Sequence, residues 1–138
     1  MNAARLVVDA SAVVAVLLDA GESGTWLARR LESAELYAPA LLAFECSNVF
    51  RRHELSGLIS PDQAAQAHAD LTDLPIAFFP YEVLAQRIWQ LKKNLSSYAA
   101  AYVALAEALD VPLVTLDRRL AEVPGVRCRV ELPPAASS

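Results

Sequence analysis

Short runs of β-branched and aliphatic residues alternate with longer segments of helical periodicity along almost the whole chain. The short runs predict strands over residues 5–9, 35–38, 75–80, 112–117 and 126–130. The segments between them predict helices over residues 10–20, 22–33, 40–56, 60–74, 81–93 and 96–109, with a helical turn over 118–123. This alternation predicts an α/β fold, in which helices flank both sides of a mainly parallel central sheet of about five strands.

Glycine and serine mark the expected ends of several helices. Gly21 and Gly57 directly follow the predicted helices over residues 10–20 and 40–56, and each is expected to end the helix before it. Ser60 precedes a proline and predicts a helix start, because its hydroxyl can accept a hydrogen bond from a free backbone N–H. Ser96 or Ser97 is expected to cap the last long helix in the same way.

The length and composition predict one folded domain. The chain has 138 residues, of which 55% are hydrophobic and 20% charged, too apolar and too weakly charged for a disordered protein. We expect a single domain over residues 1–132 and a disordered tail over residues 133–138. No apolar run resembles a signal peptide or is long enough to span a bilayer. Cys46 and Cys128 are expected to be free thiols, and the protein to be cytoplasmic.

The formal net charge of −4 excludes one class of function. A protein that coats duplex nucleic acid without specificity needs a basic excess to neutralise phosphates. A metal-dependent nuclease does not, because a cation offsets the carboxylates that hold it. The charge therefore leaves a metal-dependent nuclease open.

Two predicted strands end in an aspartate. Asp9 ends the first strand and Asp117 the fourth. Because ligands bind at the carboxyl ends of parallel strands, the two carboxylates are expected to share an anionic site. Each of them could instead simply cap the following helix. Ser11 and Thr115 lie near them in sequence, and their hydroxyls could hold the carboxylates or a metal-bound water in place.

Glu45 supplies a third candidate acid, within an otherwise apolar helical segment. A buried carboxylate has to be paired, protonated or bound to a cation. Asn48 could donate a hydrogen bond to it, and Arg51 or Arg52 could form an ion pair with it instead of a metal site. Acids without histidine among them favour a hard cation, Mg²⁺ or Mn²⁺, and such an ion suits phosphoryl chemistry.

Basic and aromatic residues offer candidate contacts to a nucleic acid. Arg118 and Arg119 follow Asp117 and could bind phosphates, or could equally be solvated charges on a short helix. Four aromatic residues could stack on bases, but their spacing favours packing in the core; they are Trp26, Phe78, Phe79 and Trp89.

The chain resembles the PIN-domain family, in particular the VapC-type toxins of bacterial toxin–antitoxin pairs. Four motifs in order carry the resemblance: residues 7–12 around Asp9, Glu45 with Asn48 and Arg51, residues 98–106, and residues 113–120 around Asp117. The resemblance implies an α/β/α sandwich and a metal-dependent endoribonuclease with four acids at its active site. It also implies a cognate antitoxin, an RNA substrate and a homodimer.

Three of the four acids carry over, as Asp9, Glu45 and Asp117. The family's fourth acid belongs in the segment Tyr98–Tyr102, where Ala99 stands instead of an aspartate. Ala99 is either natural, in a member that binds RNA or antitoxin without cutting, or an introduced Asp→Ala change that inactivates a toxin. Both accounts predict little or no nuclease activity for the chain as written.

Overall fold

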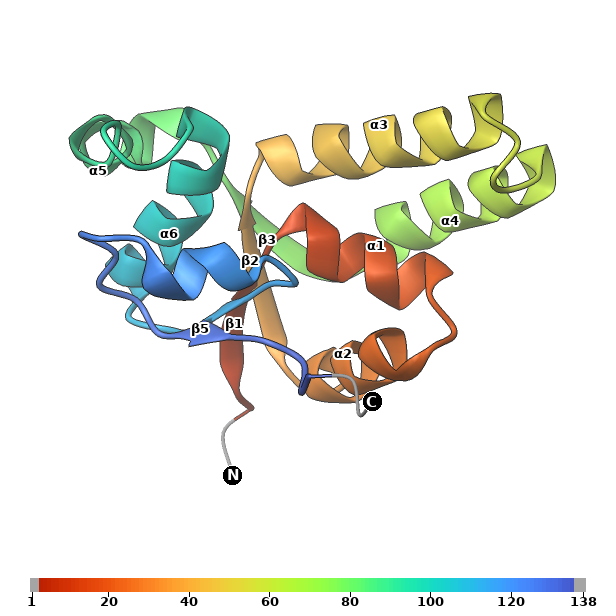
Figure 1. Ribbon diagram of the computed structural model, residues 1–138, viewed down its shortest axis with the longest axis horizontal. Helices are drawn as coiled ribbons and strands as arrows, with labels where there is room; N and C mark the ends of the chain where they lie inside the picture. The colour runs from red at the N-terminus through yellow and green to blue at the C-terminus, as the bar shows by residue number, and fades with distance from the viewer. Residues whose placement is uncertain (1–2, 136–138) are drawn as a thin grey trace.

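Five parallel strands form the centre of the protein, in the order β3-β2-β1-β4-β5. The computed structural model describes residues 3–135 (Figure 1). The strands, in chain order, are β1 (Arg5–Val8), β2 (Glu35–Pro39), β3 (Ile76–Phe79), β4 (Leu113–Val114) and β5 (Val130–Glu131). The predicted α/β class and mainly parallel sheet are therefore confirmed, and every strand pair is parallel.

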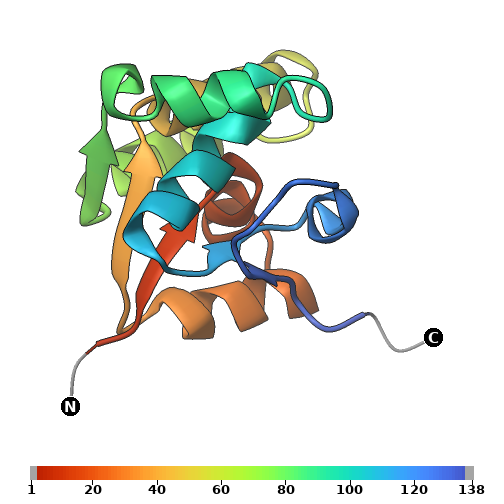
Figure 2. The same ribbon diagram turned by 90° about the vertical axis from the view of Figure 1, so that its left-hand side faces the viewer.

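Helices cover both faces of the sheet, in the layered arrangement seen in Figures 1 and 2. On one side lie α5 (Ala85–Gln90) and α6 (Ser97–Leu109), and α6 contacts β1, β2 and β4. On the other side lie α1 (Ala10–Leu18), α2 (Glu22–Leu31), α3 (Leu41–Leu55) and α4 (Pro61–Asp73). Two short 3₁₀ helices, η1 (Tyr81–Val83) and η2 (Arg118–Glu122), complete the chain.

The core forms where the central strand meets these layers. Leu6, Val7 and Val8 of β1 are fully buried, as expected for a strand covered on both faces. Helix α6 is mainly alanine on its buried side, so its backbone packs close to the sheet. β1 and β4 are neighbours, with Val8 opposite Val114, so the residues that follow the two strands meet at one edge.

Helix caps account for several element boundaries. The Ser60 hydroxyl accepts a hydrogen bond from the Gln63 N–H while the Gln63 side chain accepts one from the Ser60 N–H, a complete capping box. The Ser96 hydroxyl caps α6 by accepting from the Ala99 N–H at 3.2 Å. The prediction for Gly21 is wrong: its φ is −81°, and it precedes α2 rather than ending α1. α1 ends earlier, at Leu18, because the Asp19 carboxylate accepts the Gly21 N–H at 2.7 Å and turns the chain there.

Other boundaries also differ from the expectations. The predicted helix over residues 81–93 divides into η1 and α5, and β4 and β5 are each only two residues long. Pro133, expected in the tail, is buried, and its carbonyl accepts a hydrogen bond from Arg118 Nη2 at 2.9 Å. This contact fixes the first residue of that segment, while residues 136–138 of the expected tail lie outside the described part. Among residues 3–135 no helix combines the length and apolar character that crossing a membrane requires.

Candidate active site

Asp9 lies directly after β1, at the carboxyl edge of the sheet, and only 9% of its surface is exposed. Its Oδ1 accepts hydrogen bonds from the Ser11 hydroxyl at 2.7 Å and from the Ala12 N–H at 3.0 Å. The second of these contacts caps α1, so capping and site formation are not alternatives for this residue. The Thr115 hydroxyl donates to Oδ2 from the neighbouring strand end. Both carboxylate oxygens are therefore held in fixed directions.

Hydroxyl groups join the ends of β1 and β4 into one network. The Thr115 Oγ1 that donates to Asp9 also accepts the Asp117 N–H at 3.0 Å. Ser11 Oγ accepts the Leu116 N–H at 3.0 Å. The two hydroxyls thus fix the backbone that carries Asp117 relative to Asp9.

Glu45 reaches this region from α3 and is half-buried. The alternative that Asn48, Arg51 or Arg52 pairs with it does not hold, since all three occupy exposed positions of α3 and, among residues 3–135, none of them forms a hydrogen bond or ion pair with this carboxylate. Its partner is Tyr102 of α6, whose hydroxyl donates to Glu45 Oε1 at 2.5 Å.

The three acids line one cavity of about 360 Å³. Its lining combines the residue after β1 with residues of α1, α3, the start of α6 and the segment after β4. In chain order they are Asp9, Ala10, Ser11, Glu45, Ser96, Tyr98, Ala99, Tyr102, Asp117 and Leu120. Ala99, in the first turn of α6, is half-buried in this lining. The sequence motifs that lie far apart along the chain thus meet in one place.

Burial and repulsion between neighbouring negative charges raise the pKa of two of the three carboxylates, Asp9 and Glu45. Burial raises the pKa of Asp9, and the negative charge of Asp117 raises it further. The hydrogen bonds that the carboxylate accepts from Thr115, Ser11 and Ala12 lower the pKa but do not cancel the rise. Burial likewise raises the pKa of Glu45, with a further contribution from the Asp9 charge. A cation among these groups would relieve both effects, because it offsets the charges that are costly to bury together.

The oxygen atoms that line the cavity are of the type that binds a hard divalent cation, but too few of the side chains that carry them are gathered around one point. All the candidate ligands are carboxylate or hydroxyl oxygens, which Mg²⁺ and Mn²⁺ prefer. Within the described part of the chain, no three His, Cys, Asp or Glu side chains lie close enough together to hold one ion. Position 99 lines the same cavity and contributes only a methyl group.

Two arginines next to the cavity already have partners. Arg119 donates to both oxygens of Asp117, at 3.0 and 3.1 Å, and this contact lowers the pKa of that carboxyl. Arg118 turns instead towards the Pro133 carbonyl. As phosphate contacts, both residues remain a prediction.

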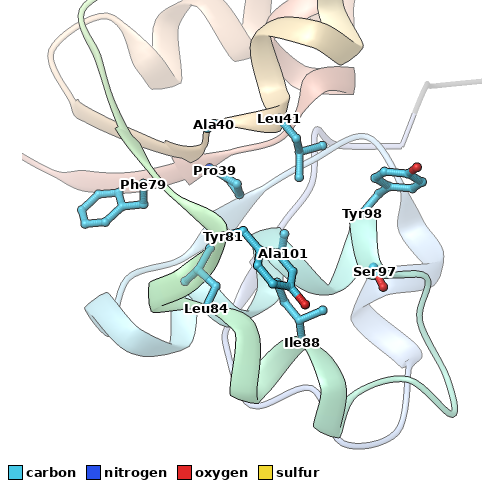
Figure 3. A pocket seen from close by; sticks show the side chains of 10 residues that line it. All are labelled: Pro39, Ala40, Leu41, Phe79, Tyr81, Leu84, Ile88, Ser97, Tyr98 and Ala101. Carbon is cyan, nitrogen blue, oxygen red and sulfur yellow. The ribbon is translucent and has the colours of Figure 1, made fainter.

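An apolar cavity of about 270 Å³ adjoins the acidic one, and Tyr98 lines both. Figure 3 shows it between the start of α3, the segment after β3, α5 and the start of α6. Phe79 lines this cavity and packs against the core, and Trp26 packs against the core elsewhere, as the sequence indicated.

Core packing is the wrong expectation for the other two aromatic residues. Phe78 is 46% exposed because β3 is an edge strand, and Trp89 is 65% exposed on a helix of only six residues. Lys92 covers part of the Trp89 ring, with its Nζ 4.3 Å from the ring centroid.

Sequence reasoning missed the role of Tyr102 as the partner of Glu45. The available signal was its position three residues after Ala99, which places both on one face of a helix.

Comparisons with known proteins show the family of the chain. Residues 6–126 match the family model of the PIN domain. Over 127 residues the chain is 44% identical to Ribonuclease VapC1 of Mycobacterium tuberculosis. The aligned region covers 91% of this chain and 96% of that protein.

Two solved structures share the fold. VapC20 of Mycobacterium tuberculosis, a toxin that cleaves the sarcin-ricin loop, has a TM-score of 0.63 at 14% identity, over 82% of this chain and 90% of that one. VapBC2 from Rickettsia felis, bound to a DNA fragment from its promoter, has a TM-score of 0.61 at 12% identity, over 93% and 98% of the two chains.

Proposed function

Since the chain belongs to the PIN-domain family as a VapC-type member, we propose that its site is that of an endoribonuclease that cleaves RNA phosphodiester bonds with Mg²⁺ or Mn²⁺. The observation that carries the proposal is the meeting of Asp9, Glu45 and Asp117 in one cavity at the carboxyl edge of a parallel sheet. A relative that is 44% identical and named a ribonuclease supports the reaction class.

Each acid has a separate part in this proposal. Asp9 and Asp117 would hold the ion directly or through water, and Glu45 would either bind it or position the attacking water. The chemistry that Mg²⁺ would supply there is activation of a water and neutralisation of the charge that develops on the phosphate. Ser11 and Thr115 keep the Asp9 carboxylate in one orientation through their hydrogen bonds.

Several further residues belong to the proposed site. Arg118 and Arg119 are proposed to contact RNA phosphates next to the acids. Arg119 holds Asp117 through Nε and Nη2, so its remaining N–H groups can contact a phosphate. Asn48 is exposed on α3 one turn after Glu45, so it is proposed as a supporting polar group at the rim rather than as a partner of that carboxylate.

We propose that this chain is catalytically impaired, because Ala99 occupies the position of a fourth carboxylate. Mg²⁺ is bound by few protein ligands, so the loss of one weakens the site strongly. Changes outside the coordination sphere already cost roughly 10- to 100-fold in metal affinity or activity. Replacing an alanine with aspartate in the first turn of α6 is compatible with the fold, since a negative charge there is favourable.

The proposed partners are an RNA substrate, a cognate antitoxin and a second copy of the chain. The structural match to VapBC2 supports an antitoxin partner, because the name VapBC2 denotes a toxin together with its antitoxin. The proposed cellular compartment is the cytoplasm.

A non-catalytic module that binds RNA or antitoxin is the second candidate. The observation that favours it is the absence, among residues 3–135, of three metal-ligating side chains gathered for one ion.

One experiment separates the two candidates. This chain and its Ala99→Asp variant are incubated with a panel of RNAs in Mg²⁺ or Mn²⁺, with EDTA as the control. Cleavage by the variant alone, stopped by EDTA, supports the impaired ribonuclease. If neither protein cuts, the nuclease proposal fails in favour of the binding module.

A further inference from the structure

Tyr102 is a nearly buried residue that lines the acidic cavity. Only 4% of its surface is exposed, and its hydroxyl donates to Glu45 Oε1 at 2.5 Å. The two residues are 57 positions apart in sequence and come from α6 and α3. This hydrogen bond therefore joins two helices at the site rather than stabilising either one alone.

The position of Tyr102 on α6 connects it to residue 99. The two positions are three residues apart on one helix, so they lie on the same face, and both line the acidic cavity. One turn of α6 thus carries the position of the missing carboxylate and the group that contacts Glu45.

The contact also restricts how Glu45 can present its oxygens. The terminal torsion of a glutamate is broad, so a half-buried side chain without a partner samples many orientations of its carboxylate. A phenol hydroxyl has one proton to donate, and Tyr102 gives it to Oε1. Among residues 3–135 no donor bonds Glu45 Oε2, and Glu45 lines the cavity, so this oxygen is available to a ligand there.

We propose that Tyr102 is a positioning residue, which holds the Glu45 carboxylate in the orientation that binds the divalent ion or its water. The inference rests on the proposed metal-dependent function and adds a residue to it. Groups that orient a metal ligand from outside the coordination sphere change metal affinity by roughly 10- to 100-fold when they are lost.

Tyr102→Phe tests the proposal, because it removes the hydroxyl and keeps the ring in the core. In the Ala99→Asp background, we expect this change to weaken Mn²⁺ binding by about 10- to 100-fold in calorimetric titrations. Tyr37→Phe is the matched control. The Tyr37 hydroxyl also donates to a glutamate, at 3.0 Å to Glu35 Oε2, but on the exposed surface away from the cavity. It should leave Mn²⁺ affinity unchanged.

A second background separates positioning from a general structural effect. In the Ala99→Asp chain that also carries Glu45→Ala, Tyr102→Phe should no longer change Mn²⁺ affinity, because there is no carboxylate to orient. An equal loss in both backgrounds overturns the proposal, and so does an unchanged affinity when Glu45 is present. Thermal unfolding of each variant identifies any that fails to fold.

The outcomes also distinguish this inference from the proposed function. If the Ala99→Asp chain binds Mn²⁺ but cuts no RNA, the nuclease proposal fails while the Mn²⁺ affinities still decide the role of Tyr102. If that chain binds no Mn²⁺ at all, both are overturned, since Glu45 then has no ion to serve.

Discussion

The Thr115 hydroxyl donates a hydrogen bond to the Asp9 carboxylate, which joins the ends of two neighbouring parallel strands. Thr115 is fully buried, and the same oxygen accepts the Asp117 N–H. One side chain thus fixes two of the three acids relative to each other. Thr115 therefore stabilises both the acidic site and the edge of the sheet at which the two strands end.

Replacing Thr115 with valine keeps the shape of the side chain and removes both hydrogen bonds. We expect the free energy of unfolding to fall by about 1–3 kcal/mol, because a buried carboxylate oxygen and a backbone N–H lose their partner. Urea unfolding measures this. Thr72→Val is the control, since the Thr72 hydroxyl bonds a carbonyl on an exposed helix surface. Equal losses in the two variants would contradict a special role for Thr115.

Asp9→Asn should stabilise the metal-free protein at neutral pH. Because burial raises the pKa of Asp9, the folded protein binds this proton more tightly than the unfolded chain does. Its stability therefore falls as the pH rises from the unfolded value of about 3.9 through the raised folded value. We expect the variant to have the higher Tm at pH 7 in EDTA, and the difference to shrink as the pH is lowered towards 4. A variant that is less stable than its parent throughout this range contradicts the expectation.

The ion pair between Arg87 and Glu107 connects α5 to α6. Arg87 donates to both Glu107 oxygens, at 2.6 and 3.2 Å, and to the Gly125 carbonyl at 2.7 Å. Arg87→Met should cost about 2 kcal/mol of unfolding free energy, the range for hydrogen bonds to charged groups. Arg5→Met is the control, because its pair with Glu35 is exposed and 4.0 Å long, and it should cost clearly less than Arg87→Met. The prediction fails if the two changes cost the same.

The two cysteines should react slowly in the folded protein. Burial raises the pKa of Cys46 to about 12 and that of Cys128 to about 11, so little thiolate is present at pH 8. Alkylation followed by mass spectrometry should modify Cys128 first, since it is only partly buried, and both residues rapidly after unfolding in urea. Rapid labelling of native Cys46 is the contrary result.

Much of the fold was predictable because its signals are local. The capping groups Ser60 and Ser96 act within three residues, and Asp9 and Asp117 could be placed at one edge because parallel strands end on the same side. The partner of Glu45 was not predictable in this way, because the hydrogen bond from Tyr102 depends on how α3 and α6 pack.

The remaining errors also have tertiary causes. The exposure of Phe78 follows from the edge position of β3, which the order of strands in the sheet determines and the chain order does not. Gly21 satisfied the sequence pattern of a helix end, but a side-chain contact from Asp19 ended the helix earlier.

The most direct measurement is a calorimetric titration of Mn²⁺ into this chain and into its Ala99→Asp variant. The central claim is that the acidic cavity is a divalent-metal site that lacks one carboxylate at position 99. It predicts at least a tenfold tighter Mn²⁺ affinity for the variant, and loss of that gain when Asp9 is also replaced with asparagine. Equal affinities of the two chains, or a gain that survives the loss of Asp9, would contradict the claim.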